Sequence, residues 1–410
     1  MSDSLRGLFG NKNFRLLFTG NALSGVGQGM TIIGAQWYIA QHFPSSHVLG
    51  AIMTVTIVAS MLAGPYFGAL IDRHKRKNLL LIENVCGFVG LGAMSLLGVF
   101  GSYTLISLGA VYLFTVMIFN LHFPATYALT QESFSPQLYG RISGILEVVT
   151  QTSAIVAGGL TGYILESVGL PMIFAIDSLT YAVSFFFLMS FQYEVRVGIT
   201  KARRHFIGEM RIALGFLRSR PRFTAMNIAL IMPFLVLVSL DLVQPFYVSQ
   251  TMHAPANVFS LMNCFYAAGA TAAGLWMRNF SLSVGNNFAY VSAFLLFAGS
   301  LAALAIFPVA WLVFIMMVLV GWCNAGVRVN RISLIMHAVP VDLIGRINMF
   351  FGFAGSCIRS VMLLYLTWGI DALGAQWCYV SMGIILMISL WMYSGSAKKN
   401  EVVIAGNTSI

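Results

Sequence analysis

The sequence predicts an all-α membrane protein whose twelve transmembrane helices form two six-helix bundles. Three observations lead to this prediction. Charged residues make up 9% of the 410 residues, against about 25% in a soluble domain, and apolar residues make up 58%. The apolar residues fall into about twelve runs, each close to the roughly 20 residues that a helix needs to cross a bilayer. One long basic segment, residues 192–222, separates the first six runs from the last six.

The order of the runs predicts both the spans and the domains. The expected spans are 16–40, 48–71, 78–100, 103–125, 141–165, 169–191, 223–247, 256–277, 286–307, 309–332, 346–368 and 373–394. We therefore expect an N-terminal bundle over 1–191, a cytoplasmic linker over 192–222, and a C-terminal bundle with a cytoplasmic tail over 223–410. Within the linker, Phe206, Met210, Leu214 and Leu217 recur at helical spacing, which predicts a short amphipathic helix on the membrane surface.

Basic residues predict the orientation of the chain. Lys and Arg occur before the first span, in every second connection and after the last span: Arg6, Lys12, Arg15, Arg73, Lys75, Arg76, Lys77, Arg141, Arg278, Arg331, Arg346, Lys398 and Lys399. The intervening connections carry neither. Cytoplasmic connections are the ones enriched in Lys and Arg, so we expect a multi-pass protein of the inner (cytoplasmic) membrane with both termini in the cytoplasm. The net charge of +10 then matches anionic lipid, and nucleic acid is not an expected partner.

Several classes of site are not expected. The chain has no phosphate-binding loop of the form Gly-x-x-x-x-Gly-Lys-Ser/Thr, no nucleophile elbow and no paired catalytic carboxylates, so we do not expect an enzyme. The five cysteines stand singly in apolar runs without metal-ligand spacing, which predicts packing roles and neither a metal nor a cofactor. Energy for any transport must then come from an ion gradient.

The connection after the second span carries the most specific motif. It reads Gly68-Ala-Leu-Ile-Asp72-Arg73-His-Lys-Arg76-Lys77 and resembles the signature of the same connection in the major facilitator superfamily, with Lys75 where glycine is usual. A weak internal repeat agrees with this family, because Gly140-Arg141 before the fifth span is echoed by Gly345-Arg346 before the eleventh. Parallel repeats of this kind occur in two-lobed transporters.

Further motifs are similar to those of one branch, the macrolide-efflux and enterobactin-exporter group. They are Phe123-Pro124-Ala125 at the end of the fourth span, Gly140-Arg141, and the acid with small and aromatic residues in Ile176–Tyr181. The resemblance implies the major facilitator fold and alternating access. It also suggests a cytoplasmic gate of Gly68, Asp72, Arg73 and Arg76, in which Asp72 faces the positive N-terminal end of the eleventh span. The alternative is that these basic residues only set the topology.

In the resembled fold, spans one, four, seven and ten line a central cavity. With the buried arginine of the eleventh span, their polar residues form the expected substrate cavity: Asn21, Gln28, Gln36, Asn120, His122, Asp241, Gln244, Asn324, Arg328 and Arg359. Each Asn or Gln has the alternative role of an interhelical hydrogen bond, and Arg328 that of snorkelling to the headgroups. Arg359 has two alternatives: an ion pair with Asp241 between the two halves, or, with Arg328, a positive cavity for a substrate that carries carboxylates.

Membrane-embedded acids are the candidates for proton coupling. They are Glu147, Asp177 and Asp241. At about 1.5 Å of rise per residue, Glu83, His122 and Glu147 fall in the cytoplasmic half of the bilayer. The first span carries Gln28 and Gln36 in place of the acid that many exporters have there, which leaves the coupling ion open.

The predicted function is a secondary active transporter that works by alternating access. We expect a proton-coupled exporter of an amphiphilic or anionic small molecule, such as a carboxylate siderophore or a drug. One alternative is an importer, a symporter of a small anionic metabolite or siderophore; another is a non-transporting membrane receptor or enzyme. The expected partners are the small molecule, a proton or other coupling ion, and membrane lipid, and we expect a monomer.

Overall fold

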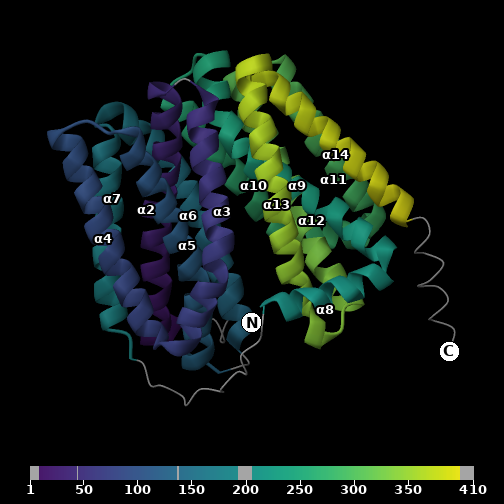
Figure 1. The fold of residues 1–410 in the computed structure, drawn as a ribbon, viewed down its shortest axis with the longest axis horizontal. Helices are drawn as coiled ribbons and strands as arrows, with labels where there is room; N and C mark the ends of the chain where they lie inside the picture. The colour runs from purple at the N-terminus through teal and green to yellow at the C-terminus, as the bar shows by residue number, and fades with distance from the viewer. Residues whose placement is uncertain (1–8, 44, 136–137, 193–205, 398–410) are drawn as a thin grey trace. The chain divides into compact units, whose positions relative to one another are not determined.

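The computed structural model describes residues 9–43, 45–135, 138–192 and 206–397, and these ranges are helical without a strand (Figure 1). Twelve of the helices have at least 20 residues: α2 (Lys12–His42), α3 (Ser46–Arg73), α4 (Arg76–Phe100), α5 (Leu105–Ser133), α6 (Tyr139–Ser167), α7 (Leu170–Met189), α9 (Pro221–Phe246), α10 (Ala256–Val284), α11 (Asn286–Ile306), α12 (Ala310–Ala338), α13 (Val341–Leu373) and α14 (Ala375–Ala397). The predicted twelve-helix membrane fold is confirmed. Within the described ranges, eleven of these helices are long and apolar enough to cross a membrane by themselves. The twelfth is α2, which carries Asn21, Gln28 and Gln36.

The chain divides into two compact units. Unit 1 comprises residues 1–201 and 254–264, and unit 2 comprises residues 202–253 and 265–410. The first turns of α10 therefore belong to unit 1 and the rest of that helix to unit 2. The domain limits at 191 and 222 stay predictions, and part of the predicted linker lies outside the described residues. A short helix, α8 (Phe206–Ser219), occupies the end of that linker, where Ala213 and Leu217 are buried and Arg211 is exposed.

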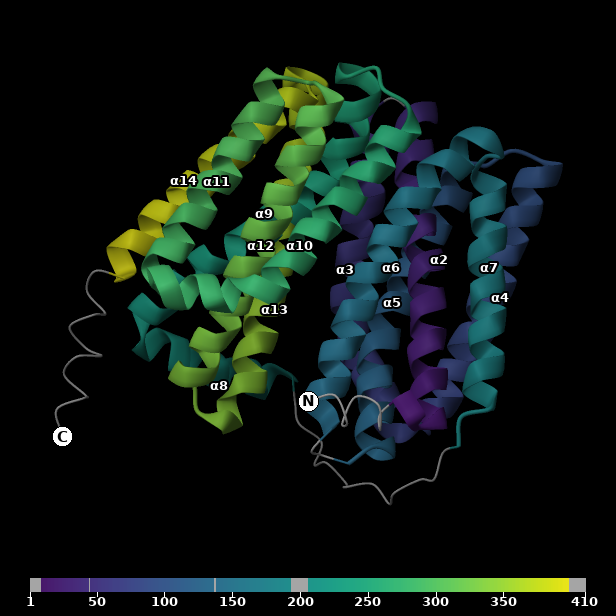
Figure 2. The same ribbon diagram turned by 180° about the vertical axis from the view of Figure 1, so that it is seen from behind.

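The two units repeat the same pattern of helix pairs. In unit 1, α7 packs against both α4 and α2, and α2 also packs against α6. In unit 2, α14 packs against both α11 and α9, and α9 also packs against α13 (Figures 1 and 2). When the twelve long helices are numbered in chain order, each helix in these unit 2 pairs comes six places after its counterpart in unit 1. This repetition agrees with the weak sequence repeat before the fifth and eleventh spans.

A left-handed glycine joins the last two helices of each unit. Gly169 connects α6 to α7 with φ of 92°, and Gly374 connects α13 to α14 with φ of 93°. Residues with a Cβ seldom adopt this conformation, whereas glycine does so without a steric penalty. Nothing lies within 4 Å of where a Cβ at Gly374 would stand. Backbone conformation, rather than lack of space, therefore favours glycine at that turn.

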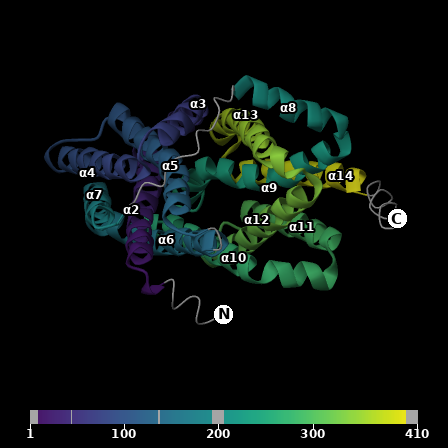
Figure 3. The ribbon, with the colours of Figure 1, turned by 90° about the horizontal axis from the view of Figure 1, so that it is seen from below.

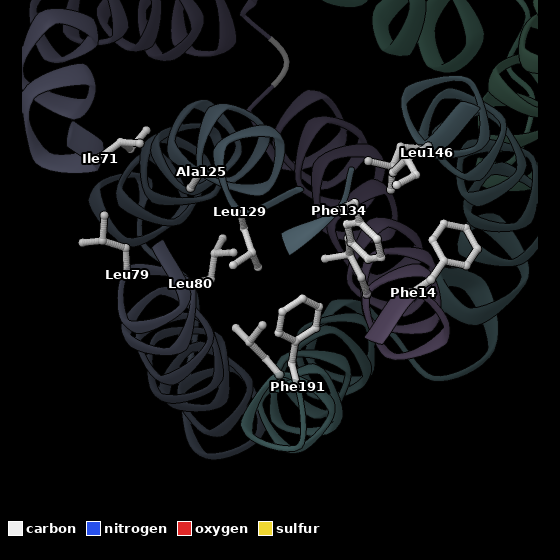
Figure 4. Close-up of a cluster of buried hydrophobic side chains, with 12 residues drawn as sticks. Phe14, Ile71, Leu79, Leu80, Ala125, Leu129, Phe134, Leu146 and Phe191 are labelled. Carbon is white, nitrogen blue, oxygen red and sulfur yellow. The ribbon is translucent and has the colours of Figure 1, made fainter. Parts of the chain in front are cut away.

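An apolar cluster closes one end of unit 1. Its members come from all six helices α2–α7 and from the residues that follow α5 and α7: Phe14, Leu17, Ile71, Leu79, Leu80, Ala125, Leu129, Phe134, Ile142, Leu146, Leu188 and Phe191 (Figure 4). Each lies toward the helix ends nearest the α3–α4 connection, which Figure 3 views end-on. Between membrane-spanning helices, close packing of such side chains stabilises through van der Waals contact. The cluster therefore holds the six helices together at the end that carries Asp72–Arg76.

Candidate functional site

Unit 1 contains a pocket of about 170 Å³ between α2, α4, α5, α6 and α7. Its polar lining side chains include Asn21, Gln28, Glu83, His122, Thr126 and Ser153. Its apolar lining is largely aromatic and includes Ile32, Phe119, Phe123, Tyr127, Leu146 and Tyr181. Ligand sites typically combine an apolar wall with a few convergent polar groups. This hollow, called the unit 1 pocket below, therefore has the composition of a site for an amphiphilic molecule.

A buried histidine lies at the centre of the polar wall. His122 Nδ1 is 2.8 Å from Glu83 Oε1, and His122 Nε2 is 2.7 Å from Asn21 Oδ1. The amide of Asn21 is oriented by its Nδ2, which donates to the Leu17 carbonyl at 2.7 Å. The Asn21 oxygen is thus left to accept from the imidazole. The three side chains join α2, α4 and α5 through one hydrogen-bonded chain.

Glu83 and His122 differ in how deeply they are buried. The side chain of Glu83 is 1% exposed and that of His122 is 20% exposed, and both residues line the pocket. Glu83 Oε2 is buried and has no hydrogen-bond partner among the described residues. A buried carboxylate oxygen without a donor is costly. The sequence placed Glu83 and His122 in the same half of the bilayer, but Glu83 was not among the predicted site residues. That shared half was the signal that could have paired them.

The predicted cavity residues of the N-terminal half separate into two groups. Asn21, Gln28 and His122 line the unit 1 pocket, and Gln28 Nε2 also donates to the Thr115 carbonyl at 3.3 Å. The other two predicted residues make interhelical hydrogen bonds instead. Gln36 Nε2 donates to the Tyr112 hydroxyl at 3.3 Å, and Asn120 Nδ2 donates to the Ser60 hydroxyl at 2.9 Å.

In unit 2, Asp241 of α9 and Arg359 of α13 form an ion pair. Arg359 Nη2 is 3.8 Å from Asp241 Oδ2 and donates to the Val238 carbonyl at 2.7 Å. The ion pair considered from the sequence is therefore present. Both residues lie in unit 2, so the expectation that the pair joins the two halves is wrong. Arg359 Nε is buried and has no hydrogen-bond partner in the described part of the chain.

The remaining predicted cavity residues lie elsewhere in unit 2. Gln244 is 3% exposed on α9. Asn324 of α12 is buried and its Nδ2 donates to the Tyr266 hydroxyl of α10 at 2.8 Å, whereas its Oδ1 has no partner among the described residues. Arg328 lies one turn further along α12 and is half-buried. None of these side chains lines the unit 1 pocket.

The two acids predicted for coupling in the N-terminal half have very different surroundings. Asp177 of α7 is fully buried and accepts hydrogen bonds from Thr31 Oγ1 at 2.5 Å and from Thr180 Oγ1 at 3.3 Å. It packs directly on Gly27 of α2, where a Cβ would overlap its carboxylate. Glu147 is exposed on α6 and accepts from Gln151 Nε2 at 3.2 Å. Neither lines the unit 1 pocket.

The residues of the predicted gate lie at the α3–α4 connection. Asp72 and Arg73 are exposed, and no described atom lies within 4 Å of where a Cβ at Gly68 would stand. Arg76 Nη1 is 3.2 Å from Glu132 Oε1 near the end of α5. Lys77 Nζ donates to the carbonyls of Met189 and Phe191 at 3.0 and 2.7 Å. Within unit 1 the basic residues therefore tie the start of α4 to the ends of α5 and α7.

The described residues contain no group of three or more His, Cys, Asp or Glu that could hold a metal ion. The polar side chains of the unit 1 pocket, which include Glu83 and His122, can hold and exchange protons and can form hydrogen bonds with a ligand.

The fold is similar to those of several solved transporters. A mutant of the nucleoside transporter NupG matches with a TM-score of 0.76 at 12% identity, over 94% of this chain and 100% of that one. The peptide transporter PepTSo of the POT family matches with a TM-score of 0.73 at 10% identity, over 95% and 98%. A bacterial homologue of the iron transporter ferroportin, in its inward-facing state, matches with a TM-score of 0.68 at 13% identity, over 93% and 98%.

Sequence comparison gives the family directly. No curated protein sequence matches the chain. The family model described as Major Facilitator Superfamily matches residues 17–362, which is most of the chain and includes long helices of both units. The protein therefore belongs to the Major Facilitator Superfamily.

Proposed function

We propose that the protein is a secondary active transporter that exports an amphiphilic or anionic small molecule by alternating access, in exchange for protons. The observation that carries this proposal is the unit 1 pocket, whose lining combines polar side chains, including the buried carboxylate of Glu83, with four aromatic rings. Aromatic and apolar walls bind the body of an amphiphile, and a few polar groups select its head. The motifs at Phe123–Ala125 and Gly140–Arg141 favour the macrolide-efflux and enterobactin-exporter branch.

An anionic cargo is supported by a separate observation in unit 2. Arg359 Nε lacks a hydrogen-bond partner among the described residues although Asp241 lies beside its guanidinium. An unsatisfied guanidinium N–H is a donor for a carboxylate. Asp241 would then move away from Arg359 as cargo binds, which also makes it a coupling candidate. Asp177 and Glu147 stay coupling candidates as well, although Asp177 is sealed by Thr31 and Thr180.

The proposed direction depends on orientation. Because Lys and Arg gather at alternate connections, we place both termini and the Asp72–Lys77 connection in the cytoplasm of a cell with this protein in its inner membrane. The gate of Gly68, Asp72, Arg73 and Arg76 would then act at the cytoplasmic end.

Transport in membrane vesicles of both orientations tests this function. We expect inside-out vesicles that contain the protein to accumulate a fluorescent amphiphile or a carboxylate siderophore when their lumen is acidified, and to lose it when the proton gradient is collapsed. Vesicles without the protein are the control. Accumulation only in right-side-out vesicles would show the importer instead. If neither orientation moves any cargo under a gradient, the protein is not the proposed transporter.

Neutralising single acids tests the coupling residues. We expect that at least one of Asp241→Asn, Asp177→Asn and Glu147→Gln loses uphill transport and retains downhill exchange. If all three retain uphill transport, these acids do not couple transport to protons.

A further inference from the structure

The Glu83–His122–Asn21 chain contains one proton more than neutral imidazole with ionised carboxylate. Both ring nitrogens of His122 face oxygen acceptors, Glu83 Oε1 at 2.8 Å and Asn21 Oδ1 at 2.7 Å. Each contact needs a hydrogen, and neutral imidazole supplies one N–H whereas imidazolium supplies two. The second hydrogen is therefore an added proton, held either by the ring or by Glu83 Oε1. With this proton the pair is electrically neutral.

His122 lines two cavities. The first is the unit 1 pocket. The second, of about 30 Å³, is lined by Asn21, Ser24, Asn84, His122, Thr126 and Ser184 together with apolar-cluster residues such as Leu17 and Phe191. About 10–15 Å³ is enough for one water molecule if several polar groups surround it. The imidazole therefore borders both the pocket and a small space that is large enough for a water molecule and is lined by polar groups and by residues of the apolar cluster.

When His122 Nε2 loses the added proton, a hydroxyl group nearby can donate a hydrogen bond to it. Thr126 Oγ1 lies 3.4 Å from His122 Nε2. When Nε2 releases its proton, the Thr126 hydroxyl can donate to the nitrogen, while Nδ1–H continues to donate to Glu83. The proton passes from Nε2 to water, and no other covalent bond is made or broken. The hydrogen bond from Nε2 to Asn21 Oδ1 is lost, because both atoms are then acceptors, and the pair has a net charge of −1.

The surroundings of the pair favour a cation as the replacement for that proton. Four aromatic rings line the pocket, from Phe119, Phe123, Tyr127 and Tyr181, and its lining contains no Lys or Arg. Aromatic faces attract cations, more strongly where water is excluded. Glu83 Oε2 is already without a donor among the described residues, so an uncompensated negative charge there would be costly.

Other titratable groups near the pair are few. Tyr127 and Tyr181 line the pocket; Tyr181 is within electrostatic range of Glu83 and of Asp177 on α7. On α6, Glu147 interacts with Tyr127 and is exposed. Among the residues that line either cavity, none from α2 or α6 carries an ionisable side chain, and none comes from α3.

We propose that Glu83 and His122 form a proton-exchange site that holds one proton when the unit 1 pocket is empty and releases it when an amphiphilic cation occupies the pocket. The net charge of the site is then zero in both states, because the cation takes the place of the proton. This inference rests on the proposed transport function and keeps only its amphiphilic cargo. That cargo carries a positively charged head on an aromatic or apolar body, and the anionic cargo considered above for Arg359 is the competing alternative.

Proton release on ligand binding tests the site without transport. The purified full chain in weakly buffered detergent micelles near neutral pH would receive phenethylammonium, or 3-phenylpropionate as a probe of similar shape and opposite charge. We expect wild type to release roughly one proton per bound phenethylammonium, and no proton with 3-phenylpropionate. Glu83→Gln and His122→Asn should release none. Asp371→Asn, which changes an exposed acid in unit 2, is the matched control and should behave as wild type.

The pH dependence of ligand affinity in the wild type gives a second test, which does not depend on whether the variants fold. Affinity for phenethylammonium should fall by up to about tenfold for each unit of pH decrease while the pair becomes protonated, whereas affinity for 3-phenylpropionate should not fall. Cation binding without proton release, absence of cation binding, or preference for the anion would overturn the inference. Proton-driven transport of an anion in vesicles would also overturn it and leave the transporter function standing; absence of all vesicle transport would overturn the function itself.

Discussion

The Asp241–Arg359 pair allows a double-mutant cycle that separates its two interpretations. The changes are Asp241→Asn, Arg359→Gln and both together. At the observed separation of 3.8 Å, two unit charges interact by about 4 kcal/mol at an effective dielectric constant of 20 and by about 1 kcal/mol in water. The two side chains are 36% and 25% exposed, so solvent screening favours the lower value. We expect a coupling energy of about 1 kcal/mol, a factor of about five in an equilibrium constant.

Arg359→Gln should cost more than this coupling. Arg359→Gln also removes the bond to the Val238 carbonyl, and a hydrogen bond from a charged donor contributes about 1.5–3 kcal/mol. The assay is the apparent free energy of unfolding of the purified chain in micelles with increasing sodium dodecyl sulfate, followed by tryptophan fluorescence. Asp371→Asn is a suitable reference for loss of an exposed acid.

Transport by the same variants completes the cycle. If the pair is structural, the double variant should recover much of the transport that either single variant loses, because it leaves no unpaired charge. If Arg359 binds cargo, Arg359→Gln and the double variant should be equally inactive. A coupling energy close to zero, with additive losses of stability, would refute the ion pair as a stabilising contact.

Three further predictions concern stability and use the same unfolding assay. Thr31→Val removes a hydroxyl that donates to buried Asp177, so it should cost about 1–3 kcal/mol; Thr31→Ser keeps the donor and should cost much less. Lys77→Met removes two hydrogen bonds to carbonyls at the end of α7 and should lower stability by about 1–3 kcal/mol; Lys77→Arg, which retains N–H donors, should cost less, and equal losses would contradict the capping role. Gly374→Ala forces a Cβ into a left-handed turn with free space around it and should cost about 1–2 kcal/mol; an unchanged stability would show that the turn relaxes.

Elements with a strong local signal were predictable. The twelve helices follow from runs of apolar residues, because crossing a bilayer requires about 20 of them in succession. The α3–α4 connection was recognisable because Asp72-Arg73 and Arg76-Lys77 interrupt such a run. The helix ends differ from the predicted ends by up to eight residues, because polar residues such as Lys12 and Ser133 extend the helices beyond their apolar parts.

The candidate site was predictable only in part. His122, Asn21 and Gln28 were chosen as polar residues on the first and fourth spans, and they line the unit 1 pocket. Gln36 and Asn120 satisfied the same criterion but bond to Tyr112 and Ser60 instead. Position along a helix gives depth in the bilayer, and it does not determine which neighbouring helix a side chain meets.

Composition and charge order by themselves determined that this chain is a polytopic helical membrane protein. Runs of about 20 apolar residues can cross the hydrocarbon core as helices, whose backbone groups pair internally, and charged residues cluster between the runs. Tertiary structure alone decided which buried charges meet. Glu83 and His122 are far apart in the sequence, and so are Asp241 and Arg359; they pair because packing brings α4 to α5 and α9 to α13. The interaction energy of two charges depends on their separation and on their burial, and neither quantity can be read from the sequence.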